Sequence, residues 1–243
     1  MKFIILVLVL ISGLAAFSKE VTYKVDGADY QGFLLSKGSK APLVILIHDW
    51  DGLTDYEVKR AKSLHKLGYS VLAIDLFGKG VRPTDVKDKM AHTGELYKDR
   101  KKMRSLLDGS LEYAKSKGLN VKNAVAMGYC FGGAAVLEWA RSGQDLKGFV
   151  TFHGGLETPK DQSYENSTGS FLILHGGADS MISMAQFAEL ADQLEAQKLD
   201  HEMIVYGGAP HAFTVFGQDS YRKEADKNSW ARFLEFLSKA TKK

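Results

Sequence analysis

Short apolar runs alternate with amphipathic stretches along the chain, a pattern that predicts strands connected by helices. Leu43 to Ile47 is a continuous run of Leu, Val and Ile, typical of a parallel strand buried on both faces. Asp26 and Gly27 separate the first two runs and indicate a hairpin turn. The other predicted strands are Val21 to Val25, Gln31 to Leu35, Val71 to Ile74, Ala124 to Met127, Phe149 to Phe152, Phe171 to Leu174 and Met203 to Tyr206. We therefore predict an α/β fold, a three-layer sandwich with a mostly parallel central sheet flanked by helices.

Helical periodicity marks the stretches between these strands. Trp230, Phe233, Leu234 and Leu237 recur at the spacing of one helical face and predict a final helix that packs on the core. The other predicted helices are Tyr56 to Leu67, Leu96 to Lys117, Phe131 to Arg141 and Met184 to Lys198. No repeat, low-complexity tract or Pro-rich linker interrupts the alternation, so we predict a single domain.

Two long segments, Phe77 to Gly94 and Gly154 to Gly169, lack clear periodicity. Each follows a predicted strand, and ligand sites of α/β sheets lie at the carboxyl ends of the strands. Loops of this length in a compact domain are often functional. We expect both segments to shape a pocket.

Composition and charge exclude several classes of protein. Among 243 residues, 45% are hydrophobic and 25% charged, which rules out wholesale disorder, a collagen-like repeat and a disulfide scaffold. The net charge is only +3, less than a dedicated nucleic-acid binder usually concentrates, so we expect no nucleic-acid partner. The basic stretch Lys98 to Arg104, interrupted by Asp99, is interpreted as a solvated helix face.

The N-terminus has the three parts of a secretory signal peptide: Lys2, the apolar run Phe3 to Ile11, and the small residues Ala16 and Ser18 around Phe17. We predict cleavage after Ser18, which leaves residues 19–243 as one domain in the periplasm or outside the cell, without membrane attachment. The apolar stretch is short for a membrane span, which needs about 20 residues. An uncleaved N-terminal anchor is the alternative.

Cys130 is the only cysteine, so no internal disulfide is possible, although exported proteins usually pair their thiols. It lies in Gly128-Tyr129-Cys130-Phe131-Gly132-Gly133, between a predicted strand and a predicted helix. Such a strand-to-helix turn is so sharp that the neighbours of the nucleophile must lack side chains. The helix would also point its positive N-terminus at Cys130 and favour the thiolate. We predict a nucleophilic cysteine at this elbow.

A nucleophile of this type needs a base and an orienting acid, which follow it in the order Asp or Glu, then His. Asp179 comes just after the predicted strand Phe171 to Leu174, and His211 follows the one that ends at Tyr206. We predict that His211 accepts the thiol proton and protonates the leaving group, while Asp179 fixes its tautomer. A capping carboxylate and a loop histidine are the alternatives when each residue is taken alone.

The oxyanion hole of such a site uses two backbone NH groups. Phe131 is the candidate for the first and Trp50, in the loop His48 to Gly52, for the second, although Trp50 could also be a packing residue over the elbow. The strand-end residues His48, His153 and His175 match no metal-binding spacing and are interpreted as hydrogen-bonded residues. We expect neither a metal nor a cofactor.

From about Val21 to Lys239 the chain resembles the dienelactone hydrolase family of α/β-hydrolases. The resemblance rests on the elbow motif, the His48 to Gly52 loop, Asp75-Leu76-Phe77, Asp179 and Pro210-His211-Ala212-Phe213. It implies the α/β-hydrolase fold, a triad of Cys130, His211 and Asp179, and hydrolysis of lactones or small esters. It also implies that an acidic residue modulates the thiol, a role that falls on Asp49, one methylene shorter than the usual Glu.

In members that cleave dienelactone, two arginines hold the substrate carboxylate. Lys79 and Val215 stand at those positions here. A single ammonium controls carboxylate geometry less tightly than two guanidinium groups, so we expect modest selectivity for anionic lactones and competitive turnover of neutral esters. Arg82 could restore an anion site if its loop folds inward; the alternative is a solvated loop arginine.

Together these features predict a cysteine hydrolase that cleaves small-molecule lactones or carboxylic esters through an acyl-enzyme intermediate, and we expect a monomer. A noncatalytic small-molecule binding protein on the same scaffold is the alternative. Cys130, Asp179 and His211 argue against it, since a binding module does not need all three. Thiol-based redox chemistry is a third possibility, weakened by the absence of a resolving cysteine.

Overall fold

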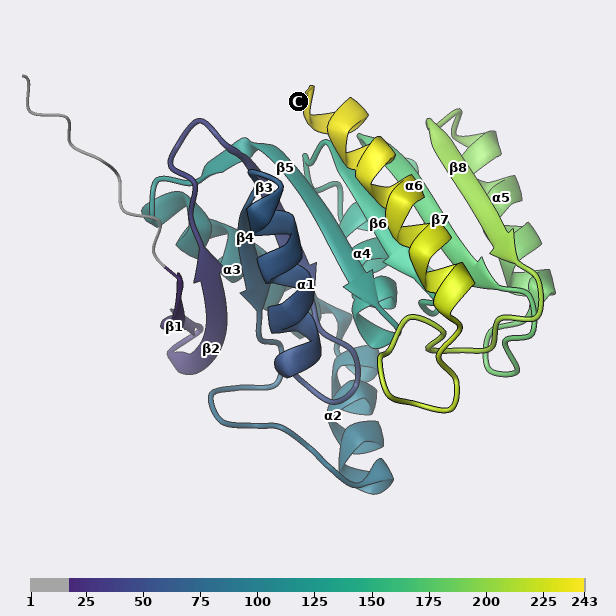
Figure 1. Cartoon of the computed structure of the whole chain (residues 1–243), viewed down its shortest axis with the longest axis horizontal. Helices are drawn as coiled ribbons and strands as arrows, with labels where there is room; N and C mark the ends of the chain where they lie inside the picture. The colour runs from purple at the N-terminus through teal and green to yellow at the C-terminus, as the bar shows by residue number, and fades with distance from the viewer. Residues whose placement is uncertain (1–17, 243) are drawn as a thin grey trace, which may run out of the picture.

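A single eight-stranded sheet runs through residues 18–242, the part of the chain that the computed structural model describes (Figure 1). The strand order is β1-β2-β4-β3-β5-β6-β7-β8. Strand β2 is antiparallel to both of its neighbours, and every other neighbouring pair is parallel. The strands are β1 (Ser18–Val25), β2 (Ala28–Leu35), β3 (Pro42–Ile47), β4 (Ser70–Ile74), β5 (Asn120–Tyr129), β6 (Gly148–Phe152), β7 (Ser170–Gly176) and β8 (His201–Tyr206). The predicted α/β architecture is confirmed, whereas the predicted signal peptide falls almost entirely on residues 1–17, outside the described part.

The predicted hairpin joins β1 to β2, where Val25 faces Ala28. The two residues between them, Asp26 and Gly27, have φ angles of 49° and 83°. Positive φ at both central positions is the requirement of the two-residue turn whose twist matches that of paired strands, and an Asp-Gly pair meets it at low cost. The sequence signal and the backbone therefore agree.

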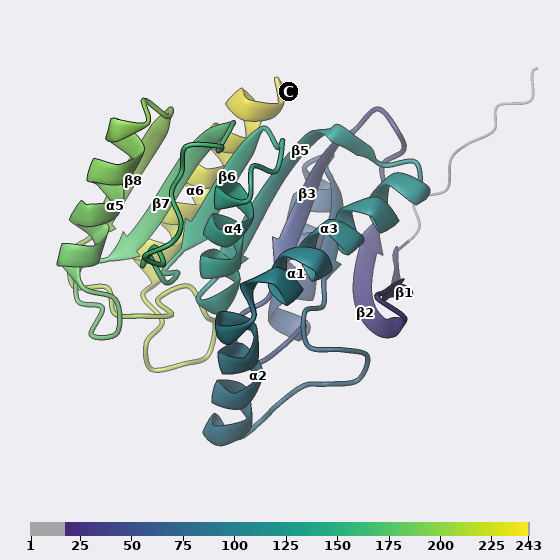
Figure 2. The same cartoon turned by 180° about the vertical axis from the view of Figure 1, so that it is seen from behind.

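Helices cover both faces of the sheet (Figures 1 and 2). One face carries α1 (Asp55–Lys66) and α6 (Lys223–Thr241), and the other carries α3 (Arg100–Ser116), α4 (Phe131–Arg141) and α5 (Met184–Ala196). Alternation along each strand sends side chains to both layers. In β3, for example, Val44 and Leu46 pack with the first pair of helices, whereas Ile45 and Ile47 pack with the second group. The sandwich therefore has two apolar cores, one on each side of the sheet.

The single helix predicted over Leu96 to Lys117 is wrong: two helices meet at Asp99. Helix α2 (Val86–Lys98) ends there and α3 begins, because Asp99 leaves helical geometry and its side chain accepts a hydrogen bond from the backbone NH of Lys102, at 2.9 Å. Helix α2 also occupies part of the segment that we expected to be irregular. Val86 and Met90 of α2 are about 60% exposed, so the sequence of this helix lacks the buried apolar stripe from which a helix is predicted.

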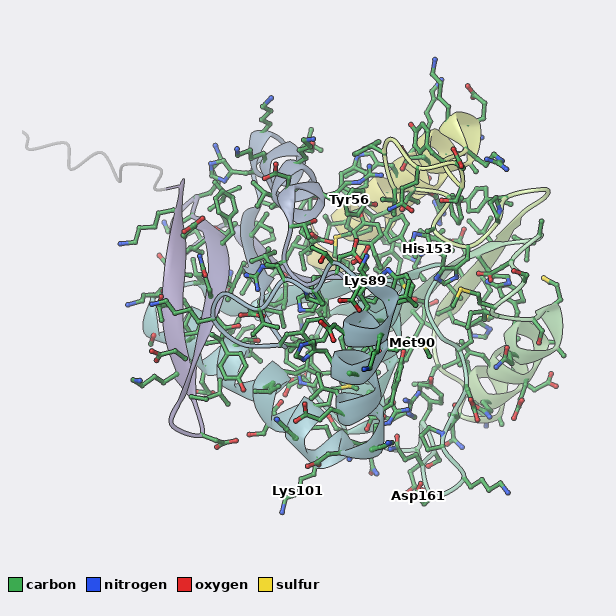
Figure 3. The ribbon with its side chains drawn as sticks, turned by 90° about the horizontal axis from the view of Figure 1, so that it is seen from below. Tyr56, Lys89, Met90, Lys101, His153 and Asp161 are labelled. Atoms are coloured by element: carbon green, nitrogen blue, oxygen red, sulfur yellow. The ribbon has the colours of Figure 1, made fainter. Side chains whose placement is uncertain are left out.

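The interpretation of Lys98 to Arg104 as a solvated helix face is confirmed for Lys98, Asp99, Lys101 and Lys102, which are exposed, but not for the two arginines. Lys101 points away from the molecule (Figure 3), but Arg100 and Arg104 form ion pairs with Glu138 on α4. The Glu138 side chain is fully buried. Both guanidinium groups therefore turn towards this carboxylate, which also pairs with Arg141 of its own helix.

The carboxyl ends of the parallel strands meet at the lower edge of the sheet in Figure 1, where α2 and the long loops also gather. Figure 3 looks onto this edge, with Tyr56, Lys89 and His153 near its centre. Among residues 18–242, no helix combines the length and the apolar character that crossing a membrane requires. The candidate chemistry lies at the lower edge.

Candidate active site

Cys130 occupies a sharp turn between β5 and α4. Its backbone has φ 51° and ψ −115°, a conformation that non-glycine residues rarely adopt, and its NH donates to the carbonyl of Phe152 at 3.1 Å. The turn is so tight that a Cβ on Gly128 would lie 2.2 Å from the carbonyl oxygen of Gly132. A Cβ on Gly133 would meet the Thr151 hydroxyl at the same distance. The predicted elbow is therefore present, and its glycines are required by space.

Helix α4 starts directly after this turn, and Cys130 is its N-cap residue. The Cys130 carbonyl accepts the first helical hydrogen bond, from the NH of Ala134 at 3.2 Å, and no side chain caps the helix. The thiol therefore lies at the positive end of the helix dipole, which favours negative charge on sulfur.

His211 joins Cys130 to Asp179. Its Nε2 lies 3.1 Å from Cys130 Sγ and its Nδ1 lies 2.8 Å from Asp179 Oδ2. The other carboxylate oxygen of Asp179 accepts hydrogen bonds from the backbone NH groups of Met181 and Ile182, at 2.9 and 3.0 Å. The structure thus brings the three predicted residues together in the order thiol, imidazole, carboxylate.

The surroundings of His211 favour the charged form of its side chain, the imidazolium. Burial lowers the pKa of His211, but hydrogen bonds with Asp179 and Cys130 outweigh it and raise the pKa to about 10. For Asp179, burial raises the pKa, while the hydrogen bonds from His211 and Ile182 outweigh burial and leave it below the ordinary value. An imidazolium between two groups that carry or develop negative charge is the arrangement that nucleophilic catalysis by cysteine needs.

A buried network of hydrogen bonds lies beside the His211 ring. Its pairings were not predicted from the sequence. His153 has φ 41°, and its ring lies edge-on to the His211 ring, with centroids 5.3 Å apart. Its Nε2 lies 2.8 Å from the Thr214 hydroxyl, which lies 2.7 Å from the Tyr56 hydroxyl. Arg60 donates to the Thr214 carbonyl at 3.0 Å and forms an ion pair with Asp226. These contacts join residues more than 60 positions apart, so no local pattern announces them.

The other two strand-end histidines have structural partners. His48 donates from Nδ1 to the Asp49 carbonyl at 2.6 Å and accepts the NH of Leu76 at Nε2, at 3.1 Å. His175 stacks on Phe187, but among the described residues neither of its buried ring nitrogens has a hydrogen-bond partner, so the predicted hydrogen bonding is wrong for this residue. Hydrogen bonding is confirmed for His48 and His153. No group of three or more His, Cys, Asp or Glu side chains suited to a metal ion occurs among the described residues.

The loop after β3 lies against the elbow: a Cβ on Gly132 would meet the carbonyl oxygens of Ile47 and His48 at 2.4 Å each. Phe131 and Trp50 flank this contact, so the two candidate oxyanion donors belong to adjoining segments. The Trp50 ring packs against the core and lies under Lys89, whose Nζ is 5.2 Å from its centroid. Their roles in holding an oxyanion stay predictions.

Asp49, the candidate thiol modulator, accepts a hydrogen bond from the NH of Asp51 at 2.8 Å. Burial raises the pKa of its carboxyl to about 6, although the hydrogen bond from Asp51 opposes the shift. The positive charge of His211 also lowers the pKa of Asp49, because it stabilises the ionised carboxylate. Asp49 is therefore electrostatically linked to the site, whereas its hydrogen bond is to its own loop; thiol modulation stays a prediction.

The two candidate substrate-binding cations are not gathered at Cys130. Lys79 is exposed, and its backbone NH donates to the Asp29 carbonyl at 2.9 Å, beside the β1–β2 hairpin. Arg82 donates to the Leu53 carbonyl at 2.5 Å and lies 3.6 Å from the buried Asp75 carboxylate. Arg82 is thus engaged by Leu53 and Asp75 rather than solvated, and substrate binding by either cation stays a prediction.

A cavity of about 420 Å³ adjoins the catalytic candidates. Ala134, one helical turn after Cys130, lines it, as does Ile182, which hydrogen-bonds to Asp179. Tyr97 of α2 forms a further wall, and its ring lies 5.5 Å from that of Phe131. The segment Gly154 to Gly169 contributes Gly155, Leu156 and Glu157, as expected of a pocket-shaping loop. Tyr97 was not foreseen, because it lies where the sequence predicted the start of an unbroken helix.

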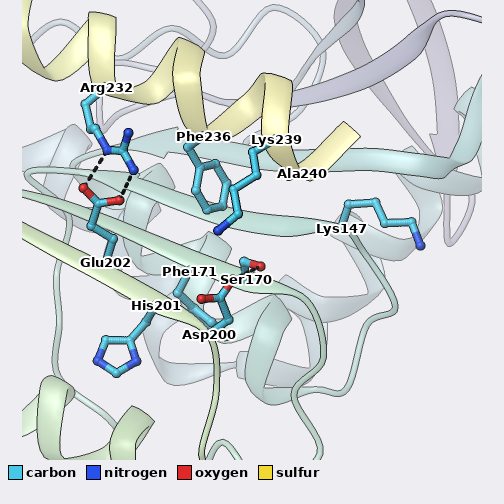
Figure 4. Close-up of a pocket in the computed structure, with 10 residues that line it drawn as sticks. All are labelled: Lys147, Ser170, Phe171, Asp200, His201, Glu202, Arg232, Phe236, Lys239 and Ala240. Carbon is cyan, nitrogen blue, oxygen red and sulfur yellow. Dashed lines mark hydrogen bonds and ion pairs between the residues drawn. The ribbon is translucent and has the colours of Figure 1, made fainter. Parts of the chain in front are cut away.

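A second cavity, of about 260 Å³, lies at the amino ends of β7 and β8 beneath α6 (Figure 4). Within its wall, Arg232 forms an ion pair with Glu202, and Ser170 donates a hydrogen bond to Asp200 at 2.7 Å. This cavity opens at the edge of the sheet opposite Cys130, so it is separate from the candidate active site.

Comparison with known proteins agrees with this geometry. A profile of the dienelactone hydrolase family matches residues 31–241. A protein of Saccharolobus solfataricus named as a carboxymethylenebutenolidase is 28% identical over 92% of this chain and 99% of its own length. A Bradyrhizobium protein named as a 2-oxo-3-(5-oxofuran-2-ylidene)propanoate lactonase is 27% identical over 82% of this chain and 84% of its own.

Among solved structures, a dienelactone hydrolase-like promiscuous phosphotriesterase called P91, from metagenomic libraries, superposes with a TM-score of 0.84. It is 27% identical in sequence, and the match covers 93% of this chain and 99% of that protein. Sequence and fold thus point to enzymes rather than to a noncatalytic binding protein. The chain belongs to the dienelactone hydrolase family and is a hydrolase that acts on the ester bonds of small lactones or esters.

Proposed function

We propose that this hydrolase uses Cys130 as a covalent nucleophile, with His211 as the general acid and base and Asp179 as the residue that orients His211. The observation that carries the proposal is the unbroken chain of contacts from Cys130 Sγ through His211 to Asp179, at 3.1 and 2.8 Å, with the sulfur presented by a strained elbow at a helix N-terminus. Both distances allow proton transfer without rearrangement.

In the first half-reaction, the Cys130 sulfur attacks the carbonyl carbon of the ester or lactone, and the carbonyl electron pair moves onto oxygen. The backbone NH groups of Phe131 and Trp50 are the proposed donors to this oxyanion. When the intermediate collapses, the carbon–oxygen bond to the leaving group breaks and the imidazolium of His211 gives its proton to the departing alkoxide. A thioester on Cys130 and a neutral His211 remain.

In the second half-reaction, His211 removes a proton from water, and the resulting hydroxide attacks the thioester carbon. The sulfur leaves as thiolate, the acid is released, and His211 is again an imidazolium beside Cys130. Asp179 stays ionised throughout, because two backbone NH groups and His211 hold its charge. No cofactor takes part in either step.

Substitution and alkylation test the assignment with p-nitrophenyl acetate as substrate. We expect Cys130→Ala to lower kcat/KM by about 10⁴-fold and His211→Ala to do nearly as much, because a triad acts as a unit. Asp179→Asn costs less. His201→Ala is the matched control, because His201 lies beside the cavity at the opposite edge. Alkylation of Cys130 by iodoacetamide must track inactivation, and an alkylated enzyme that turns over at full rate refutes the nucleophile.

We also propose that the protein is exported and works as a monomer in the periplasm or outside the cell. Support for export comes from the charged, apolar and small-residue segments of residues 1–18. Intact-mass measurement on protein from its native host is expected to give a chain that begins at or near Lys19. Retention of residues 1–18 in a membrane fraction contradicts cleavage, and a dimer mass in light scattering contradicts the monomer.

A further inference from the structure

Three arginines surround the carboxylate of Glu138 at the far end of the 420 Å³ cavity. Arg104 lies 2.6 Å from it, Arg141 lies 2.9 Å from it, and Arg100 lies 3.4 Å from it. Gln162 adds a hydrogen bond to the same group at 3.1 Å. One buried carboxylate is thus matched by three guanidinium groups, which leaves an excess of positive charge in a partly buried place.

Of these arginines, Arg100 is the one whose pairing is incomplete and which lines the cavity. Arg141 also lines it, but its side chain is 2% exposed and its other nitrogens donate to Gln162 and Tyr164, each at 2.8 Å. Arg104 is not part of the cavity wall. Arg100 donates from Nε to the Tyr97 carbonyl at 3.0 Å, has the longest of the three ion pairs through Nη1, and has a pKa that burial lowers more than Glu138 raises it. Its guanidinium therefore has unused capacity to bind an anion.

Apolar walls connect Arg100 to the nucleophile. The guanidinium lies over the Tyr97 ring, 4.7 Å from its centroid, and the opposite end of the cavity reaches Ala134 beside the elbow. Leu156 and Ile182 also line this cavity. Glu157 lies at the rim and is exposed, so solvent screens its charge. A ligand that fills this space needs an apolar middle and an anionic end.

We propose that the cavity is an acyl-binding subsite for half-esters of dicarboxylic acids, in which Arg100 binds the free carboxylate and the methylene chain lies against Tyr97, Leu156 and Ile182. The inference rests on the proposed attack by Cys130, because the scissile carbonyl must lie at the elbow for the far carboxylate to reach Arg100. The proposed subsite is distinct from the carboxylate-binding positions discussed in the sequence analysis, which Lys79 and Val215 occupy, because Arg100 comes from the junction of α2 and α3.

Paired substrates test the subsite: p-nitrophenyl hydrogen adipate and its neutral counterpart, p-nitrophenyl methyl adipate, which differ only at the far end. We expect wild-type kcat/KM to favour the anion at least tenfold, about 1.4 kcal/mol. Arg100→Gln is expected to bring this ratio close to one. Arg104→Gln, the matched control, removes a guanidinium from the same glutamate outside the cavity and is expected to keep the ratio. A wild-type ratio near one, a ratio unmoved by Arg100→Gln, or an equal collapse in Arg104→Gln each overturns the proposal.

Binding to a protein without the nucleophile separates the subsite from the mechanism. Adipate is expected to raise the Tm of Cys130→Ala, whereas hexanoate, which lacks the second carboxylate, is not. The adipate shift must disappear in the double variant Cys130→Ala with Arg100→Gln, and a shift that persists there refutes the role of Arg100. Ester turnover that survives in Cys130→Ala, by contrast, refutes the proposed nucleophile and leaves this binding result unaffected.

Discussion

Substitution of Gly132 by alanine tests the elbow directly. The new Cβ would lie 2.4 Å from the carbonyl oxygens of Ile47 and His48, whereas ordinary contacts begin at 3.4 Å. The conflict is therefore about 1 Å, the difference of these two distances. Ile47 belongs to β3, which is hydrogen-bonded on both sides to β4 and β5, so the strand cannot retreat and the elbow must move.

Displacement of Cys130, the proposed nucleophile, by about 1 Å is expected to lower kcat/KM about 100-fold, because near-attack geometry is lost. Overpacking at this point costs about 1 to 3 kcal/mol of unfolding free energy. For a domain of this size, each kcal/mol lowers Tm by about 2 to 4 °C. The expected decrease in Tm is therefore at most about 12 °C. When the assay is run below the Tm of the variant, the loss of activity is expected to exceed what the loss of stability explains.

The assay measures p-nitrophenyl acetate turnover together with thermal unfolding followed by circular dichroism. Gly94→Ala is the matched control: it lies inside α2, and no heavy atom comes within 4 Å of its Cβ position. There, alanine is expected to leave activity unchanged and to raise Tm slightly, since glycine costs a helix interior about 1 kcal/mol. A Gly132→Ala protein with wild-type Tm and kcat/KM within threefold of wild type refutes the steric account of the elbow.

Three further predictions concern His153, the pKa of His211, and the loop cations Lys79 and Arg82. His153→Phe keeps a ring beside His211 but loses the hydrogen bond to Thr214, so kcat is expected to fall about tenfold with little change in KM; steady-state kinetics on both parameters decides, and an unchanged kcat contradicts it. Because the pKa of His211 is raised to about 10, its stabilising contribution is complete below pH 6.5 and is lost as the pH rises towards 10. Denaturation at several pH values must therefore give a flatter decline for His211→Asn than for wild type. Lys79→Ala and Arg82→Ala are expected to change the ratio of kcat/KM for an anionic lactone and its methyl ester by less than threefold, and Arg82→Ala to lower stability by about 1 to 3 kcal/mol through loss of its contact with Asp75. A hundredfold anion preference that collapses in either variant shows that this loop binds the anion.

Local chemistry explains which parts were predictable. The turn at Cys130 excludes side chains at Gly128 and Gly132, so a short motif between a strand and a helix was enough to locate it. Asp179 and His211 could be placed because each follows a strand whose apolar run is unmistakable, and parallel strands bring their ends to one edge. Strand positions and the elbow thus followed from patterns that span only a few residues.

The parts that were missed depend on contacts between distant segments or on exposed apolar residues. Helix α2 carries Val86 and Met90 towards solvent, so its sequence lacks the stripe that marks a packed helix. The partnership of Arg60 with Thr214 spans 154 residues, and that of His153 with Thr214 spans 61. Pairings of this kind exist only once the sheet has brought the segments together, so no window of sequence contains them.

The ion pairs of Glu138 with Arg100 and Arg104 were not predicted from the sequence, and they bear on the proposed substrate site. Every residue of α4 is buried, from Phe131 to Arg141, so a carboxylate on this helix cannot reach solvent and must be neutralised by neighbouring groups. Arg141, one turn further along, offsets the charge of Glu138 by itself, which makes Arg100 and Arg104 more than neutrality requires. Arg100 is 25% exposed and lines the cavity, so its guanidinium is available to an anion that enters there. Because Ala134, one helical turn after Cys130, lines that cavity, the anion that we propose is the far carboxylate of the substrate, and the proposal assigns Arg100 of the basic stretch to the candidate active site.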